Sequence, residues 1–424
     1  NLDVDGGTIK LDGNYPTGDR NTALGDTALD SVEAGGTDNT VIGSRAATAT
    51  TTGDRNTVYG SDAYRCNATA SDNTAFGYQA MFCNTSGNNN IAIGNALCKN
   101  TSGLYNVAMG SGALSSNTTA SANVGIGRLA LTTNTTGACN VAIGCCALKS
   151  NTTANHNTAI GHESLKSNTE GGCNVAVGRI SLQDNTTGAN NVAIGASALQ
   201  SNTTASDNVA IGKSALTATL TGCRNVAIGS QALISNTADN NVAVGFCALK
   251  TNSSGANNTA VGRFALVLNQ TGATNTAVGQ NSLHSNTTAS DNTAVGAASL
   301  YANTTGANNV AIGRQALVAN TTGANNTTVG AYSLCDNTTG ASNTGLGYSS
   351  LDSNTEGDNN VAVGADALNK NTTADNNTAV GMSALKANTT GACNVAVGKD
   401  ALLCNTTGAE NTAVGMNAGR LTTG

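Results

Sequence analysis

The stretch NVAIGASALQSNTTASD, residues 191–207, decides the fold of this chain because nearly the same seventeen residues recur along it. The pattern is N-[TV]-A-[VI]-G-x-x-[AS]-L-x-x-N-T-T-[GA]-x-x, and we call its glycine, Gly195 in this copy, the repeat glycine. The repeat glycines lie at positions 25, 43, 60, 77, 94, 110, 127, 144, 161, 178, 195, 212, 229, 245, 262, 279, 296, 313, 330, 347, 364, 381, 398 and 415. Their spacing is 17 residues except for one interval of 18 and two of 16. A short fixed period is typical of a chain that folds as a stack of like units.

Each copy of the pattern predicts two short strands and a turn. Val192, Ala193 and Ile194 alternate large and small side chains between turn residues, which indicates a strand. Ala198 and Leu199, after the repeat glycine, indicate a second short strand. The Asn-Thr-Thr-Gly/Ala segment that follows predicts a turn, because asparagine bonds its own backbone and glycine enters the left-handed region freely.

The sequence therefore predicts an all-β fold, a parallel β-solenoid (β-roll) of about 24 coils with a 17-residue repeat. We expect residues 1–18 to form an N-terminal cap or connector and residues 19–424 to form one continuous solenoid with an incomplete C-terminal coil. Coils stacked at the inter-strand spacing of about 4.8 Å place each residue over its own copy in the next coil. Identical asparagines can then bond along the stack as ladders.

The alternation also predicts which side chains point into the coil. We expect the two β-branched residues and the leucine, such as Val192, Ile194 and Leu199, to point inward. The alanine between the β-branched residues then points outward and forms a flat, uncharged strip suited to contact with another copy of the chain. The alternative is that small residues simply line a tight bend.

Composition excludes several classes of protein. Charged residues make up only 10% of the 424, and the formal net charge is −6. Lysines and arginines are scattered singly, so the sequence has no basic stripe that could bind a nucleic acid. No apolar run approaches the roughly 18 residues that span a bilayer. The twelve cysteines show no CxxC pattern. We call a given position of the repeat a column. Cys66 and Cys83 occupy the same column in consecutive repeats, so a disulfide between them is the alternative to free thiols.

Residues capable of catalysis or metal binding are few and dispersed. His156, His162 and His284 share no column and form no helical pair, so we expect exposed loop residues and no metal site. The carboxylates Asp352 and Glu356, with Asp358, fall in turn columns and indicate a solvated surface more than a glycosidase pair. We expect no enzyme activity and no cofactor.

Two further interpretations attach to the threonine-rich turn. Asn-Thr-Thr is an acceptor for N-glycosylation, but the same asparagine persists at Asn168 and Asn354, where the third residue is not Ser or Thr, so a turn column explains it. Ice binding usually uses Thr-x-Thr, whereas the neighbours Thr186 and Thr187 point to opposite sides of the chain.

Contact with a partner along the solenoid is expected at columns that vary and are polar. The two residues after each repeat glycine meet both conditions. The candidate contact residues are Arg128, His162, Arg179, Lys213, Arg263, Phe264, Arg314, Tyr348 and Lys399.

The string Asn-Val-Ala-Ile-Gly-x-x-Ala-Leu resembles the S/N-V-A-I-G-x-x-A-x-A repeat of YadA-like heads in trimeric autotransporter adhesins. The resemblance covers about residues 21–419. It implies a left-handed parallel β-roll wound as a homotrimer. The repeat here is longer than the family's roughly 14 residues by the Asn-Thr-Thr-Gly insertion, so we expect the same roll with a different loop.

The longer form N-T-A-[VI]-G-x-x-A-L-x-x-N-T-T-G is similar to repeats of phage tail-fibre proteins, as is the opening segment Gly7–Gly18. That similarity implies a virion fibre, a stiff spacer in a phage tail or capsid fibre for host attachment, with other virion proteins at the chain ends. We expect no export signal, stalk or membrane barrel here, which favours the virion over the bacterial surface adhesin, the alternative. An ice- or glycan-binding solenoid is third. The expected partners are two further copies of the chain and a host receptor or glycan, without nucleic acid or membrane insertion.

Overall fold

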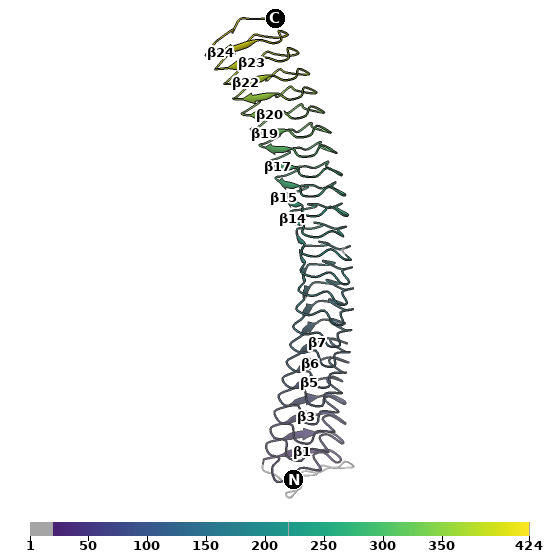
Figure 1. Cartoon of the computed structure of the whole chain (residues 1–424). Coiled ribbons are helices and arrows are strands. Elements are labelled where there is room, and N and C mark those ends of the chain that lie inside the picture. The colour runs from purple at the N-terminus through teal and green to yellow at the C-terminus, as the bar shows by residue number, and fades with distance from the viewer. Residues whose placement is uncertain (1–19, 219, 424) are drawn as a thin grey trace, which may run out of the picture. The chain divides into compact units, whose positions relative to one another are not determined.

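The computed structural model describes residues 20–218 and 220–423, which form a parallel β-solenoid and confirm the predicted fold class. The expected cap at residues 1–18 lies outside the described residues. The chain divides into two compact units, Asn1–Asn208 and Val209–Gly424, and the coils stack in sequence order within each unit (Figure 1).

Every strand among the described residues has three residues, and one strand falls in each repeat. The first unit holds β1 (Thr22–Leu24), β2 (Thr40–Ile42), β3 (Thr57–Tyr59), β4 (Thr74–Phe76), β5 (Ile91–Ile93), β6 (Val107–Met109), β7 (Val124–Ile126), β8 (Val141–Ile143), β9 (Thr158–Ile160), β10 (Val175–Val177) and β11 (Val192–Ile194). The second unit holds β12 (Val209–Ile211), β13 (Val226–Ile228), β14 (Val242–Val244), β15 (Thr259–Val261), β16 (Thr276–Val278), β17 (Thr293–Val295), β18 (Val310–Ile312), β19 (Thr327–Val329), β20 (Thr344–Leu346), β21 (Val361–Val363), β22 (Thr378–Val380), β23 (Val395–Val397) and β24 (Thr412–Val414).

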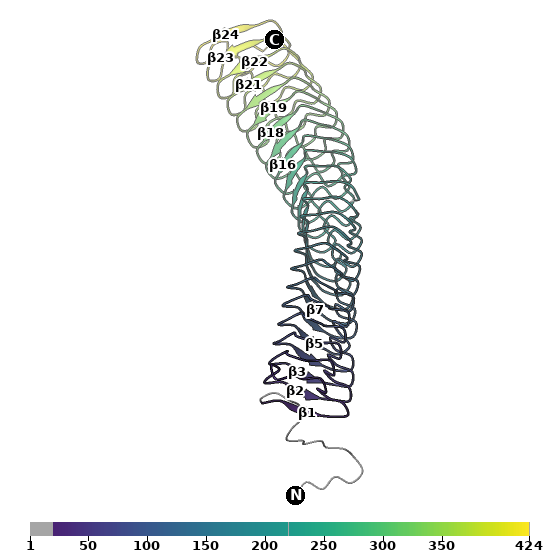
Figure 2. The same cartoon turned by 60° about the horizontal axis from the view of Figure 1, so that its bottom comes forward.

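Consecutive strands within each unit pair in parallel and in register. Val175 lies beside Val192 where β10 pairs with β11, and Val361 lies beside Thr378 where β21 pairs with β22. In the second unit, the green and yellow strands β16 to β24 follow one another along one edge of the coils (Figure 2). The pairing confirms that one repeat closes one coil.

The predicted direction of the strand side chains is wrong. Ala193, the middle residue of β11, is fully buried, whereas its neighbour Ile194 is 39% exposed and Val192 is half-buried. Only Leu199 of the three residues expected inside lies in the core. The outward alanine strip does not exist, and the outer surface of the strands carries the β-branched residues instead.

The reason is the width of the coil interior. A Cβ added to Gly125, the middle residue of β7, would lie 3.2 Å from the Cγ of Leu114 in the preceding coil. At Gly345 in β20 it would lie 2.7 Å from the Cδ1 of Leu334. The leucine of one coil therefore fills the space that the middle strand position of the next coil faces. Only a small residue fits there without overpacking.

The predicted second strand is also absent. Leu199 and Ser197 have φ values of 50° and 58°, in the left-handed region, which is incompatible with a strand. The segment is instead a turn that drives the leucine into the core: the Asn202 N–H donates to the Leu199 carbonyl at 3.2 Å, and Leu199 is fully buried.

A buried asparagine ladder precedes the strands, as predicted. The Asn191 N–H donates to Asn174 Oδ1 at 2.9 Å, and the Asn191 amide donates to Asn174 Oδ1 at 3.2 Å and to the Ala205 carbonyl at 2.9 Å. Each such asparagine thus joins its own coil to the one before it. Both residues are fully buried, so these bonds satisfy polar groups that water cannot reach.

A second asparagine ladder runs through the turns. Asn185 Nδ2 donates to Asn168 Oδ1 at 2.8 Å and to the Gly188 carbonyl at 2.9 Å. Asn174 of the first ladder donates to the same Gly188 carbonyl at 2.9 Å. One carbonyl therefore accepts two amide groups, which ties the two ladders together across the coil.

The repeat glycine is required by close approach between coils. Gly178 has a φ of +138°, and a Cβ added to it would lie 2.6 Å from the carbonyl oxygen of Gly195 in the next coil. Both the backbone conformation and the contact exclude a side chain at this corner.

Candidate interaction surfaces

The candidate contact residues lie on the outside of the coils. Eight of the nine directly follow a repeat glycine and are exposed, whereas Phe264, one position further, is half-buried. The eight exposed residues are Arg128, His162, Arg179, Lys213, Arg263, Arg314, Tyr348 and Lys399. The structure brings Arg263 and Phe264 together, with the guanidinium carbon 4.6 Å from the ring centroid.

The outer surface of the strands is uncharged: the third residue of each strand is apolar, and the first is Val, Ile or Thr. We call the first and third residues of β1–β24 the strand surface; it carries no Lys, Arg, His, Asp or Glu. Its large side chains remain at least 36% exposed at one position in most strands. In the first unit these are Tyr59, Phe76, Ile91, Ile93, Met109, Ile143, Ile160 and Ile194, and in the second they are Ile211, Ile228, Val261, Ile312, Val329, Leu346, Val380 and Val414. A row of exposed apolar side chains along stacked strands marks an interaction site.

A ladder of aromatic rings crosses four consecutive coils of the second unit. The ring centroids of Phe246 and Phe264 are 5.5 Å apart, those of Phe264 and His284 are 6.5 Å apart, and those of His284 and Tyr301 are 4.8 Å apart. His284 and Tyr301 are stacked, with an interplanar angle of 19°. Burial lowers the pKa of His284 below its ordinary value, so the ring is neutral at pH 7.

A shorter aromatic group follows in the same unit. The Tyr332 and Tyr348 centroids are 5.9 Å apart, and the guanidinium carbon of Arg314 lies 5.6 Å from the Tyr332 ring. Sequence reasoning found Arg314 and Tyr348 but missed Tyr332, Tyr301 and the role of His284. The signal is present in the sequence as aromatic residues about one repeat apart, but they lie in different columns of the repeat.

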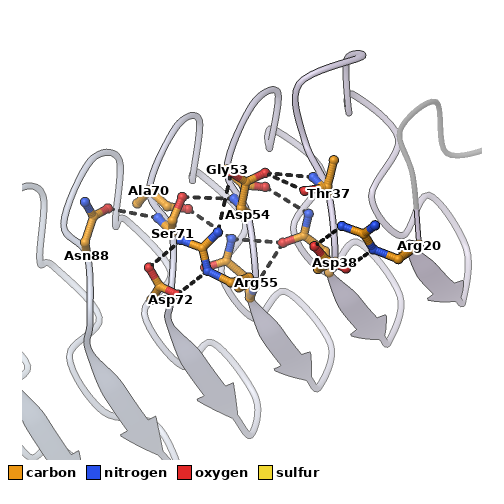
Figure 3. A network of polar contacts seen from close by, with 12 residues as sticks. Arg20, Thr37, Asp38, Gly53, Asp54, Arg55, Ala70, Ser71, Asp72 and Asn88 are labelled. Carbon is orange, nitrogen blue, oxygen red and sulfur yellow. Dashed lines mark hydrogen bonds and ion pairs between the residues drawn. The ribbon is translucent and has the colours of Figure 1, made fainter.

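Polar contacts join the first coils of the first unit (Figure 3). Arg20 Nη2 donates to Asp38 Oδ2 at 2.8 Å, and Arg55 Nη2 donates to Asp72 Oδ2 at 2.9 Å. The hydrogen bonds from Arg20 and Arg55 lower the pKa of Asp38 and Asp72, respectively. All four residues occupy the column before the ladder asparagine, so alternating charges here join adjacent coils.

A neighbouring column forms a third polar ladder that the sequence did not reveal. Asp54 Oδ1 accepts the Thr37 N–H at 2.8 Å, and Ser71 Oγ accepts the Asp54 N–H at 2.9 Å (Figure 3). In the second unit, Asp358 Oδ1 accepts the Ala341 N–H at 2.7 Å. Asp358 therefore has a structural role, which accounts for one of the three carboxylates considered for catalysis.

Glu163, the neighbour of His162, is also engaged in polar contacts. Glu163 accepts from Lys166 Nζ at 2.8 Å and from Gln183 Nε2 at 2.7 Å. The bond from Lys166 lowers the pKa of Glu163. His162 itself is exposed beside this cluster.

The twelve cysteines are free thiols in the structure, including Cys66 and Cys83. Burial, with the charges of Asp336 and Asp352 nearby, raises the pKa of Cys335 to about 11. Burial also raises the pKa of Cys66.

Residues 20–218 and 220–423 contain no group of three or more His, Cys, Asp or Glu side chains placed to hold a metal ion. They also contain no helix long and apolar enough to cross a membrane.

Comparison of the chain with protein-family models finds no match, and comparison with curated proteins finds no significant relative.

Proposed function

We propose that this chain is a structural fibre protein, a stiff spacer that assembles as a homotrimer and serves host attachment in a phage tail or capsid fibre. Three copies associate through the strand surface, each in a left-handed roll as the YadA-like resemblance implies. The observation that carries the proposal is the row of exposed apolar third residues along the strands of each unit, because a solvent-exposed solenoid has no need of it.

The size of the strand surface supports self-association. One isoleucine such as Ile143, which is 36% exposed, leaves about 65 Å² of surface for a partner to cover. Eleven third residues exposed to about this extent in the first unit offer roughly 700 Å² per chain, close to the ~800 Å² that each partner contributes to a standard stable interface. A second copy of the chain matches this surface because its repeat has the same period.

Charge on the strand surface tests the assembly. In the double variant Ile143→Asp with Ile160→Asp, association would bury two carboxylates per chain, so we expect the native mass to shift from trimer toward monomer. The matched control is Thr136→Asp with Thr153→Asp, because both threonines are exposed in turns of the adjacent coils and the charge change is identical. A wild-type chain that is monomeric at micromolar concentration by native mass spectrometry would refute the trimer.

The virion role is tested separately from the assembly. Antibodies raised against residues 20–423 should label fibres on purified phage particles. Labelling of the bacterial cell surface in the absence of phage would select the alternative, the head of a surface adhesin.

A further inference from the structure

The two aromatic groups of the second unit lie on consecutive coils, and the spacer role does not use them. We call the aromatic strip the eight side chains Phe246, Arg263, Phe264, His284, Tyr301, Arg314, Tyr332 and Tyr348. The strip occupies coils between the repeat glycines at 245 and 347. Phe246, Tyr301 and Tyr348 are 45%, 37% and 59% exposed, so ring surface remains open to solvent in the first, fourth and last of these coils.

Packing within the strip fixes the orientation of these rings. Phe264 is half-buried between Phe246 and His284, and His284 stacks on Tyr301. Arg263 lies over Phe264. Rings held by neighbours lose little freedom when a ligand covers their outer faces, so they act as preorganised platforms.

The cations of the strip lie in its first five coils. Across the whole span, residues 246–348, the sequence has Lys250, Arg263 and Arg314 and the two carboxylates Asp291 and Asp336. Asp291 lies in the column before the ladder asparagine Asn292, away from the columns of the strip, and Asp336 follows Cys335. Among the described residues, no carboxylate pairs with Arg263 or Arg314 within 4 Å.

We propose that the aromatic strip binds an acidic polysaccharide, with sugar rings stacked on the exposed aromatic faces and its carboxylates or sulfates paired with Arg263 and Arg314. Pyranose rings present flat C–H surfaces that pack on aromatic faces, and guanidinium groups bind carboxylate and sulfate through paired hydrogen bonds. At about 4.8 Å per coil, the exposed rings of Phe246, Tyr301 and Tyr348 lie about 14 Å apart in succession along the solenoid, which suits a polymer of repeating units. This inference rests on the attachment role proposed above and names the chemistry of the ligand.

Single-stranded nucleic acid is the other polymer that stacks on aromatic rings. Its recognition requires a basic groove that follows the phosphate backbone. Three cations over the five coils from 245 to 313 are too few for such a groove, so the observations favour a polysaccharide.

The test compares binding of the whole chain to three immobilised probes: alginate, a polyuronate; dextran, a neutral polysaccharide; and polydeoxythymidylate. We expect retention on alginate that weakens as salt rises, and no retention on dextran. Failure to bind alginate, equal binding to dextran, or stronger binding to polydeoxythymidylate would each overturn the proposal.

Two variants test whether alginate binds at the aromatic strip. Tyr301→Ala removes an exposed platform and should weaken alginate binding about tenfold, and Arg263→Gln should reduce its salt dependence. Tyr78→Ala is the control, because Tyr78 is 59% exposed and lies in the first unit, outside the strip. Equal affinity of Tyr301→Ala and Tyr78→Ala, at unchanged melting temperatures, would refute the site.

Native mass measured on the same sample separates this inference from the spacer proposal. A trimer that does not bind alginate overturns only the inference. A monomer that binds it overturns the assembly and leaves the site standing.

Discussion

Replacing Asn309 with aspartate should destabilise the coils around it far more than the same change at its neighbour Asn308. Asn309 is fully buried, whereas Asn308 is exposed. Asn309 Nδ2 donates to the Gly323 carbonyl at 2.9 Å and to Asn292 Oδ1 at 3.2 Å, and its Oδ1 accepts the Asn326 N–H at 2.9 Å. Aspartate keeps the acceptor and loses both donors.

The size of the effect follows from these contacts. Two lost hydrogen bonds cost about 1 kcal/mol each, and a buried carboxylate facing the Gly323 and Asn292 oxygens adds a few more, for a total of roughly 5 kcal/mol at pH 7. At Asn308 the change stays within about 0.5 kcal/mol, because aspartate also tolerates the φ of 59° found there.

The penalty at Asn309 should depend on pH with a defined sign. Burial and the facing oxygens raise the pKa of the introduced carboxyl in the folded chain above its unfolded value of about 3.9. Below the unfolded pKa the carboxyl is protonated in both states and can donate a hydrogen bond, so the penalty is smallest there. It grows as pH rises through the folded pKa.

Amide hydrogen exchange is the suitable assay, because stacked repeats open region by region and a global midpoint hides a local defect. We expect the amides of β17 to β19 to exchange about a thousandfold faster at pH 7 in Asn309→Asp than in Asn308→Asp. Equal exchange in the two variants, or a penalty that grows on acidification, would show that Asn309 is not a buried donor.

Three further substitutions or treatments probe other parts of the coil. Gly279→Ala should destabilise its unit by at least about 3 kcal/mol in urea unfolding, because φ is +136° and the new Cβ would lie 2.5 Å from the Gly296 carbonyl oxygen; a neutral result would contradict the close approach of coils. Leu317→Ala should cost about 2–5 kcal/mol by the same measurement, since Leu317 is fully buried, and a cost below 1 kcal/mol would place this leucine outside the core. Iodoacetamide at pH 8 should modify the exposed Cys393 and leave Cys335 largely unmodified, because a pKa of about 11 leaves about one thiolate in a thousand; equal labelling by peptide mass would exclude the burial of Cys335.

The stacking of coils was predictable because a position that contacts its own copy in the next coil requires the same residue type in every repeat. An asparagine that bonds its own copy, as Asn174 and Asn191 do, must recur at the period of the coil. The turn at Asn185 was equally readable, since its amide bonds the backbone three residues later.

The side of the strand that faces inward was not predictable from alternation. A period of two separates Ala193 from Val192 and Ile194 but does not say which set is buried. Hydrophobicity pointed to the larger residues, whereas the volume of the leucine in the preceding coil decides the matter. The left-handed conformation of Leu199 was not predictable either, because bulky residues are rare in the left-handed region.

The surfaces were partly predictable. Variation after the repeat glycine located exposed residues such as Arg263 and Tyr348. Contacts between columns were not readable, because His284 and Tyr301 follow their repeat glycines by five residues and Phe264 by two. Their meeting depends on how neighbouring turns project from the coil, which the repeat pattern does not encode.

A cryo-electron microscopy map of the chain with resolved side chains is the most direct test of the coil. We predict one turn per 17-residue repeat, a rise of about 4.8 Å, and density for the middle strand residue, such as Ala277, inside the coil with Val278 outside. A map with Val278 packed inside the coil and Ala277 on its surface, or with repeat glycines out of line between successive turns, would contradict the account.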